Sequence, residues 1–329
     1  MASSPRIVKV AYIAAFVLAG LAAASSLAAG PITLPLALIP LVAGIGIKRG
    51  RVWSAYGYAL FQLANLLIFL PVVMLRSAKG TFSLFETITS IAFSALVMVL
   101  FVAAGRSLAA MGAGRGRPYP WVVVSALCTV PIIFVHAFSI PSAAMENTLL
   151  IGDRVLVRTW PVPASHRGDI VVFRYPIDPK EDYVKRVIGI PGDHIRLVKK
   201  QLILNGHPVD EPYVRHIFPY IDQYRDNFPT EHPGPAVMQP ALAMLSGNVV
   251  NGELVVPTGC VFVMGDNRDD SLDSRYFGFI PAGNIEGQPL LIYWSQEVSN
   301  FDLTERPAHF FAKPRWNRTF KLVHGYPLH

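Results

Sequence analysis

The chain has 329 residues, of which 52% are hydrophobic and 16% are charged, and its mean hydropathy is +0.39. This composition excludes an intrinsically disordered protein and disfavours an ordinary soluble domain. The net charge of +7 would favour a nucleic-acid partner if the basic residues were spread along the chain. Residues 1–138, however, hold ten Lys and Arg residues and one acid. The basic excess therefore belongs to the hydrophobic part, and we predict no nucleic-acid binding.

In that part, five apolar stretches approach the length of about 20 residues with which a helix spans a bilayer. They cover residues 8–28, 31–47, 52–75, 82–105 and 121–138. Eight of the ten basic residues fall on one side of these stretches, and only Arg76 and Lys79 fall on the other. Since basic loops stay in the cytoplasm, we predict a multi-pass α-helical membrane domain in the cytoplasmic (inner) membrane, with a cytoplasmic N-terminus. Residues 139–329 then form a domain on the outer or periplasmic side.

Two alternatives concern this membrane domain. The first stretch resembles a cleavable secretory signal, because small residues at 26–30 follow its apolar core. Its length favours an uncleaved anchor, and the other spans keep the same orientation in either case. A transporter or channel would need buried ionisable groups, for which only Glu86 and His136 are candidates. Both lie near the ends of predicted spans, which favours an anchoring bundle.

After residue 138 the pattern changes to short β-rich runs separated by Gly, Pro, Asp and Asn. The Asn205-Gly206 pair between two such runs is a strong signal for a two-residue hairpin. We therefore predict an antiparallel all-β exported domain, with an inserted subdomain or long loop at about 207–252. The predicted strands are 154–158, 169–175, 183–190, 194–198, 201–204, 253–256, 260–264 and 289–294.

The cysteines and the C-terminal tail carry less information. Cys128 and Cys260 form neither a disulfide framework nor a metal-ligand spacing. In the tail after residue 305, bases alternate with aromatic residues, which is typical of a solvated terminal face or of contact with lipid headgroups. These residues are Arg315, Arg318 and Lys321 among Phe310, Phe311, Trp316 and Phe320.

Three segments of the β-rich half contain polar residues that a β-fold alone does not need. Residues 139–153 follow the last predicted span almost without a linker. Residues 183–193 begin with a strand in which Lys185 shares a face with its apolar neighbours at 183 and 187. Residues 265–281 form a loop rich in acids, Arg and Ser after a predicted strand. Taken singly, these residues would be a surface lysine, turn formers and a loop serine.

In this order behind a terminal span, the three segments resemble the bacterial signal peptidase I family. The resemblance covers residues 139–281 and is most specific over 265–281. It implies a membrane-anchored serine endopeptidase that removes signal peptides from exported preproteins by a Ser/Lys dyad, without a metal or cofactor. It also implies a groove that takes an extended peptide by strand addition. The expected partners are these signal peptides and membrane lipid, with the secretion translocon as a further candidate.

The resemblance also implies roles for individual residues. Lys185 is the general base, Ser271 hydrogen-bonds and orients it, and Asp273 with Arg275 stiffens the loop behind it. A lysine can act as a base at neutral pH only if burial lowers its ordinary pKa of about 10.4. Ser142 matches a residue whose hydroxyl stabilises the oxyanion together with the backbone N–H of residue 144. Pro141 and Met145 are expected to bind substrate.

One departure from the family concerns the nucleophile itself, because Ala144 stands where the family has a serine. A methyl group cannot attack a carbonyl, and loss of a nucleophile costs on the order of 10⁶ in rate. We therefore predict that the chain as it stands is inactive. An engineered serine-to-alanine substitution is the favoured explanation, because the other site residues are all present. The alternatives are a natural pseudoenzyme that acts as a non-catalytic receptor for signal peptides, and catalysis by Ser142 with Lys185.

Two smaller departures remain. Glu146-Asn147 precedes Thr148, where the family more often has a proline. The predicted anchor of five spans also exceeds the one or two spans usual in this family, and the resemblance says nothing about the additional ones.

Overall fold

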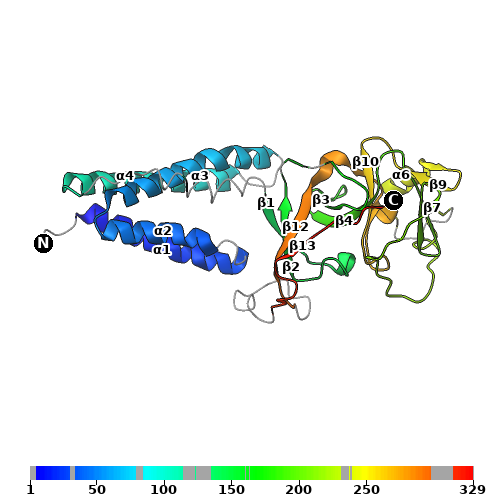
Figure 1. Cartoon of the computed structure of the whole chain (residues 1–329). Helices are drawn as coiled ribbons and strands as arrows, with labels where there is room; N and C mark the ends of the chain where they lie inside the picture. The colour runs from blue at the N-terminus through cyan, green and yellow to red at the C-terminus, as the bar shows by residue number, and fades with distance from the viewer. Residues whose placement is uncertain are drawn as a thin grey trace. The chain divides into compact units, whose positions relative to one another are not determined.

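A computed structural model describes residues 5–29, 34–78, 84–113, 123, 135–159, 161–162, 164–230, 237, 239–297 and 314–328. The chain divides near residue 135 into two compact units. Helices make up the first unit, and two antiparallel sheets form the framework of the second (Figure 1).

The described residues of the first unit include four long helices, which coincide with the first four predicted apolar stretches. Six alanines lie in the core of this unit beside larger aliphatic and aromatic side chains, and such small side chains allow close helix approach in membrane proteins. Gly105 serves the same purpose, since a Cβ there would lie 2.8 Å from the Tyr56 ring. The helices are α1 (Arg6–Ala29), α2 (Leu34–Lys48), α3 (Val52–Ala78) and α4 (Leu84–Ala110).

The outer surface of this unit is apolar. Eight of its described large aliphatic side chains are between 54% and 69% exposed, namely Val17, Leu21, Leu38, Leu67, Ile88, Leu96, Val99 and Val123. A soluble helical bundle would present polar residues at such positions. Among the described residues, one helical segment, Ile91–Ala110, is long and apolar enough to cross a membrane, and Ala37–Lys48 is a shorter apolar helix. The arrangement with several spans stays a prediction.

The end of the fifth predicted span is not helical. Val135–Ser139 form strand β1, which pairs antiparallel with β2 (Asp153–Arg158) over five residues. The prediction was wrong for residues 135–138, because their backbone groups bond to a neighbouring strand instead of to their own helix. Apart from Val123, residues 121–134 lie outside the described residues.

The larger sheet of the second unit has eight antiparallel strands in the order β1-β2-β12-β3-β4-β10-β11, and β13 pairs with β12. Two clusters of buried Val, Ile and aromatic side chains pack against it. Its other strands are β3 (Ile170–Arg174), β4 (Asp182–Gly189), β10 (Cys260–Met264), β11 (Ile280–Pro281), β12 (Ile285–Ser295) and β13 (Lys321–Leu322).

The smaller sheet has five strands in the order β7-β6-β5-β9-β8. Asn205 and Gly206 have φ angles of 53° and 81° and join β6 to β7, with Leu204 opposite His207. Two positive φ angles in a two-residue loop match the hairpin that the sequence predicts. The strands are β5 (His194–Val198), β6 (Gln201–Leu204), β7 (His207–Pro208), β8 (Val249–Val250) and β9 (Glu253–Val255).

The region 207–252 packs as part of this second unit. It contains β7, β8 and the short helix α6 (Gln239–Ser246). Its side chains Tyr224, Phe228 and Leu245 share a core with Ile195 of β5. This core places the region beside the loop that follows β10, as the contacts below describe.

Candidate active site

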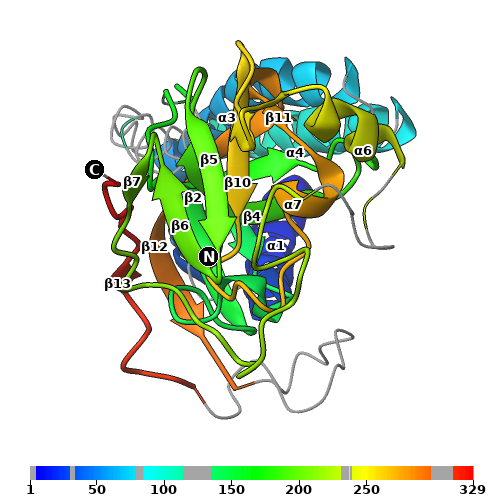
Figure 2. The ribbon, with the colours of Figure 1, turned by 90° about the vertical axis from the view of Figure 1, so that its right-hand side faces the viewer.

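The three segments singled out in the sequence meet in the second unit. The first contains the single 3-10 turn η2 (Ala143–Met145), and the third runs from the end of β10 into the short helix α7 (Ser274–Phe277), which contacts β10 (Figure 2). The Asn267 backbone N–H donates to the carbonyl of Ala144 at 3.1 Å, and its side-chain amide donates to the carbonyl of Ala143 at 3.2 Å. The loop after β10 thus holds residue 144 by its backbone.

Gly265 allows this close approach. A Cβ at Gly265 would lie 2.4 Å from the Ala144 carbonyl oxygen and 2.3 Å from the Ser271 hydroxyl. Both distances are below any normal contact, so a larger residue would push the segments apart. In the antiparallel register, Met264 lies opposite Arg186. Continuing that register by one residue places Gly265 opposite Lys185.

Lys185 is the buried amine of this site. It lies directly across from Val171, on the face of β4 that joins an apolar cluster including Val187 and Val263. Its side chain is 4% exposed, and burial lowers its pKa to about 8, which the negative charge of Asp273 partly opposes. Among the described residues, no carboxylate lies within ion-pair distance of its Nζ. The amine can therefore lose its proton near neutral pH.

Behind the lysine, Asp273 and Arg275 form a buried ion pair with two hydrogen bonds, of 2.8 and 2.7 Å. Asp273 also caps α7 and accepts from the Gly265 backbone N–H at 3.2 Å. Burial alone would raise the pKa of Asp273, but the Arg275 charge and these hydrogen bonds outweigh it and lower the pKa. The pair thus joins α7 to the end of β10, and its role in stiffening the loop, which the resemblance implies, stays a prediction.

Ser271 does not make the hydrogen bond that the resemblance implies. Its hydroxyl is buried and has no hydrogen-bond partner among the described residues. It packs instead against the Cα of Gly265, beside the carbonyl of Ala144. A buried hydroxyl without a partner is uncommon in folded proteins, so this atom marks unused hydrogen-bonding capacity in the site.

The remaining predicted site residues separate into two kinds. Pro141 and Ser142 are exposed, and Ser142 precedes η2 in an extended conformation without a side-chain capping bond. Both are accessible to a peptide. Met145 is 2% exposed and packs with Ile140 and Leu149 in a hydrophobic core. Its side chain anchors the segment and is not available to bind substrate.

Arg186 is a site residue that the sequence analysis missed. It points to the other face of β4, is 1% exposed and donates to both carboxylate oxygens of Asp266 at 2.8 and 2.7 Å. Asp266 also accepts from the Thr148 hydroxyl at 2.5 Å. The ring of Tyr213 stacks 3.8 Å from the guanidinium. One sequence signal could have indicated this pair: Arg186 lies on the strand face opposite Lys185, and the loop 265–281 offers several acids as partners.

The second missed feature is the contribution of the 207–252 region. Glu211 binds Arg268 through two hydrogen bonds of 2.9 and 2.5 Å, and Arg268 donates to the Gly265 carbonyl at 3.1 Å. The Arg215 backbone N–H donates to the Asp266 carbonyl at 2.8 Å. Weak sequence periodicity in this region concealed these contacts.

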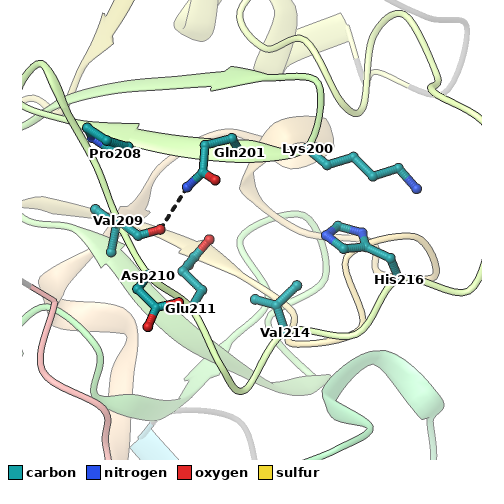
Figure 3. Close-up of a pocket in the computed structure, with 8 residues that line it drawn as sticks. All are labelled: Lys200, Gln201, Pro208, Val209, Asp210, Glu211, Val214 and His216. Carbon is teal, nitrogen blue, oxygen red and sulfur yellow. Dashed lines mark hydrogen bonds between the residues drawn. The ribbon is translucent and has the colours of Figure 1, made fainter.

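A cavity of about 460 Å³ borders the same region (Figure 3). Two of its lining residues also contact the loop after β10, since Glu211 pairs with Arg268 and His216 lies 3.1 Å from Asp269. Neither Lys185 nor Ala144 lines it. Its lining consists of Lys200, Gln201, Pro208, Val209, Asp210, Glu211, Val214 and His216.

Comparisons with known proteins identify a family for the second unit. Residues 119–294 match the family model described as signal peptidase, peptidase S26. A signal peptidase I from Bacillus caldolyticus is 39% identical over 185 residues, which cover 55% of this chain and 91% of the relative. One from Aquifex aeolicus is 32% identical over 213 residues, which cover 54% and 83%.

Among solved structures, a signal peptidase I from Enterococcus faecalis V583 is 30% identical, with a TM-score of 0.30. The match covers 39% of this chain and 97% of that chain. The range matched by the family model contains every site residue described above and begins after α4.

Proposed function

The chain belongs to the signal peptidase family, peptidase S26, and on that premise we propose that it is a signal peptidase I whose nucleophile position is occupied by Ala144. The intact enzyme is a membrane-anchored serine endopeptidase that cleaves signal peptides from exported preproteins. The chain as it stands binds such peptides without cutting them, because it lacks the attacking hydroxyl.

One observation carries this proposal. Lys185 is a buried amine with a pKa of about 8 and no carboxylate partner among the described residues, beside the segment that holds residue 144. A lysine that only stabilised the fold would be paired or exposed. Near pH 7, roughly a tenth of such a lysine is neutral, which is sufficient for a general base.

With serine at position 144, the chemistry follows from these positions. The Oγ attacks the carbonyl carbon of the scissile bond while its proton passes to the neutral amine of Lys185. The Ser142 hydroxyl and the backbone N–H of residue 144 donate to the oxyanion that forms. The C–N bond then breaks, and the leaving amine takes its proton from the Lys185 ammonium. Water, with Lys185 again as the base, hydrolyses the acyl-enzyme.

The hydrogen-bonding state of the site supports a missing hydroxyl. The Ser271 hydroxyl is buried and has no hydrogen-bond partner among the described residues, and the Lys185 amine lies over the Tyr183 ring at 5.5 Å from its centroid. A buried hydroxyl with unused hydrogen-bonding capacity beside the carbonyl of Ala144 is consistent with the removal of a serine Oγ.

The proposed setting is the cytoplasmic membrane, with the site on its outer or periplasmic face. The apolar outer surface of α1 to α4 and the basic residues at 48, 49 and 51 support several spans with a cytoplasmic N-terminus. Membrane lipid and the secretion translocon are then partners, and extended signal peptides are ligands.

Two other functions have an observation in their favour. A natural non-catalytic receptor for signal peptides fits Ala144 together with an accessible Pro141–Ser142 segment. Catalysis by Ser142 fits its exposed hydroxyl, which makes no capping bond.

One experiment separates the three. We would purify the full chain, the Ala144→Ser variant, and Ala144→Ser combined with Lys185→Ala, and offer each a preprotein in detergent. Cleavage by the single variant alone supports the proposal. Binding of signal peptides without cleavage by any variant supports the receptor. Cleavage by the unchanged chain that disappears on Ser142→Ala identifies Ser142 as the nucleophile.

A further inference from the structure

Asn147 has an unusual backbone conformation close to the site. Its φ angle is 91°, in the left-handed region that favours glycine and tolerates asparagine. Its side-chain amide donates to the carbonyls of Tyr213 and Val214, each at 3.3 Å. The residue thus fastens the end of the segment that carries Ala144 to residues 213–215 of the 207–252 region.

A second contact joins the same two segments. The Arg215 guanidinium pairs with the carboxylate of Glu146, next to Asn147. Both side chains are partly exposed, so this ion pair adds less than the asparagine contacts do.

Residues 213–215 also bind the loop after β10. The Arg215 N–H donates to the Asp266 carbonyl, and the Arg215 carbonyl accepts from the Arg268 N–H at 3.0 Å. These bonds form a parallel bridge between Arg215 and Asn267. Asn267 in turn donates to the carbonyl of Ala144. Three segments, 143–147, 213–215 and 266–268, therefore form a closed circle of contacts around residue 144.

We infer that residues 213–215 act as a positioning element for residue 144. Asn147 is the positioning residue, because its side-chain amide binds the backbone of residues 213 and 214. This inference rests on the proposed function, in which residue 144 is the place of the nucleophile. The Asn267 hydrogen bond holds residue 144 from one side, and the Asn147 contacts hold the segment three residues later. A displacement of about 1 Å at a reacting atom costs on the order of 10² in rate, so loosening one end affects the chemical step.

The test uses Asn147→Gly, which keeps the left-handed backbone but removes the amide. Asn251→Gly is the matched control, because Asn251 also has a positive φ, of 52°, in an exposed turn away from the site. In the full chain with Ala144, we expect Asn147→Gly to raise hydrogen exchange of the Asn267 amide about tenfold. The Leu197 amide, bonded to the Phe228 carbonyl, should not change. Unchanged exchange at Asn267 would overturn the inference whether or not the proposed function holds.

A kinetic test uses the Ala144→Ser background. There Asn147→Gly should lower kcat about tenfold with KM within about twofold, while Asn251→Gly changes neither. A raised KM with unchanged kcat would mean that residues 213–215 bind substrate directly, and it would overturn the positioning role. If Ala144→Ser itself is silent, the proposed function fails, and the exchange experiment still decides the inference.

The ion pair provides a rescue experiment in the same background. Glu146→Arg and Arg215→Glu should each lower kcat two- to threefold. The double exchange should restore kcat, because it re-forms the ion pair with the two charges swapped while the backbone bonds of residue 215 stay in place. Failure of the double variant to recover would count against the positioning role of residues 213–215.

Discussion

Two adjacent basic residues on opposite faces of β4 show how differently one strand can treat a buried cation. Arg186 meets Asp266 through two hydrogen bonds, stacks on Tyr213, and is fully paired. Lys185 is equally buried, but among the described residues no carboxylate contacts its amine, and its pKa falls to about 8. The fold thus keeps one cation charged with a partner and leaves the other free to become neutral.

The comparison of Arg186 with Lys185 shows what separates a buried cation that stays charged from one that can become neutral. A buried charge is tolerated only when a partner compensates for its lost hydration. Where the partner is withheld, the group shifts its pKa, and that shift creates a base. Burial of the Lys185 amine lowers the free energy of unfolding. The Arg186–Asp266 pair does not directly offset this loss.

Removal of the Lys185 amine should have the largest effect. In the Ala144→Ser background, Lys185→Ala should lower kcat/KM by at least about 10⁴, since members of a catalytic unit fail together. Preprotein cleavage measured at saturating and limiting substrate checks this. Residual activity within a factor of ten of the parent would contradict the role of Lys185 as the base.

Arg186→Met should destabilise the protein by about 3–5 kcal/mol, because Asp266 is left buried without its partner. Thermal unfolding of the full chain in detergent, followed by near-UV circular dichroism, measures this change. Asp270→Ala is a control at an exposed acid of the same loop and should lie within about 0.5 kcal/mol of the parent. Equal stabilities for the first variant and the parent would remove the contrast between the two cations.

Lys185→Met should act in the opposite direction and stabilise the protein at pH 7 by about 3 kcal/mol, since each unit of pKa shift corresponds to about 1.36 kcal/mol. The native pKa lies below the unfolded one, so the unfolded chain binds the extra proton between pH 8 and 10.5. Parental stability should therefore rise with pH across this window, and the variant should lack the rise. A destabilised Lys185→Met variant at pH 7 would show that the amine is paired and charged.

The pH profile of the Ala144→Ser enzyme should show the smallest of the four effects. Because only the neutral amine accepts a proton, kcat/KM should rise about tenfold per pH unit and level off near pH 8. Asp273 raises the pKa of Lys185, so Asp273→Asn should move the bend in the profile to lower pH. A bend near pH 10 would mean that burial does not lower the lysine pKa.

Much of this protein could be read from local sequence. The apolar lengths of α1 to α4, the Asn205-Gly206 hairpin and most strands depend on periodicity and turn chemistry within a few residues. The direction of Lys185 followed from strand alternation, and the chemistry-bearing loop followed from its composition. Such features are determined by neighbours along the chain.

The tertiary structure decided the features that depend on distant partners. Residues 135–138 read as the end of an apolar span, yet they form β1 because β2 offers them backbone partners. Met145 reads as part of the site but lies in the core, and Ser271 lacks its expected bond. The hydrogen bonds from Asn147 to the carbonyls of Tyr213 and Val214 join positions that are 66 and 67 residues apart in the sequence. Hydrogen bonds of that kind are selected by three-dimensional proximity, which no periodicity in the sequence encodes.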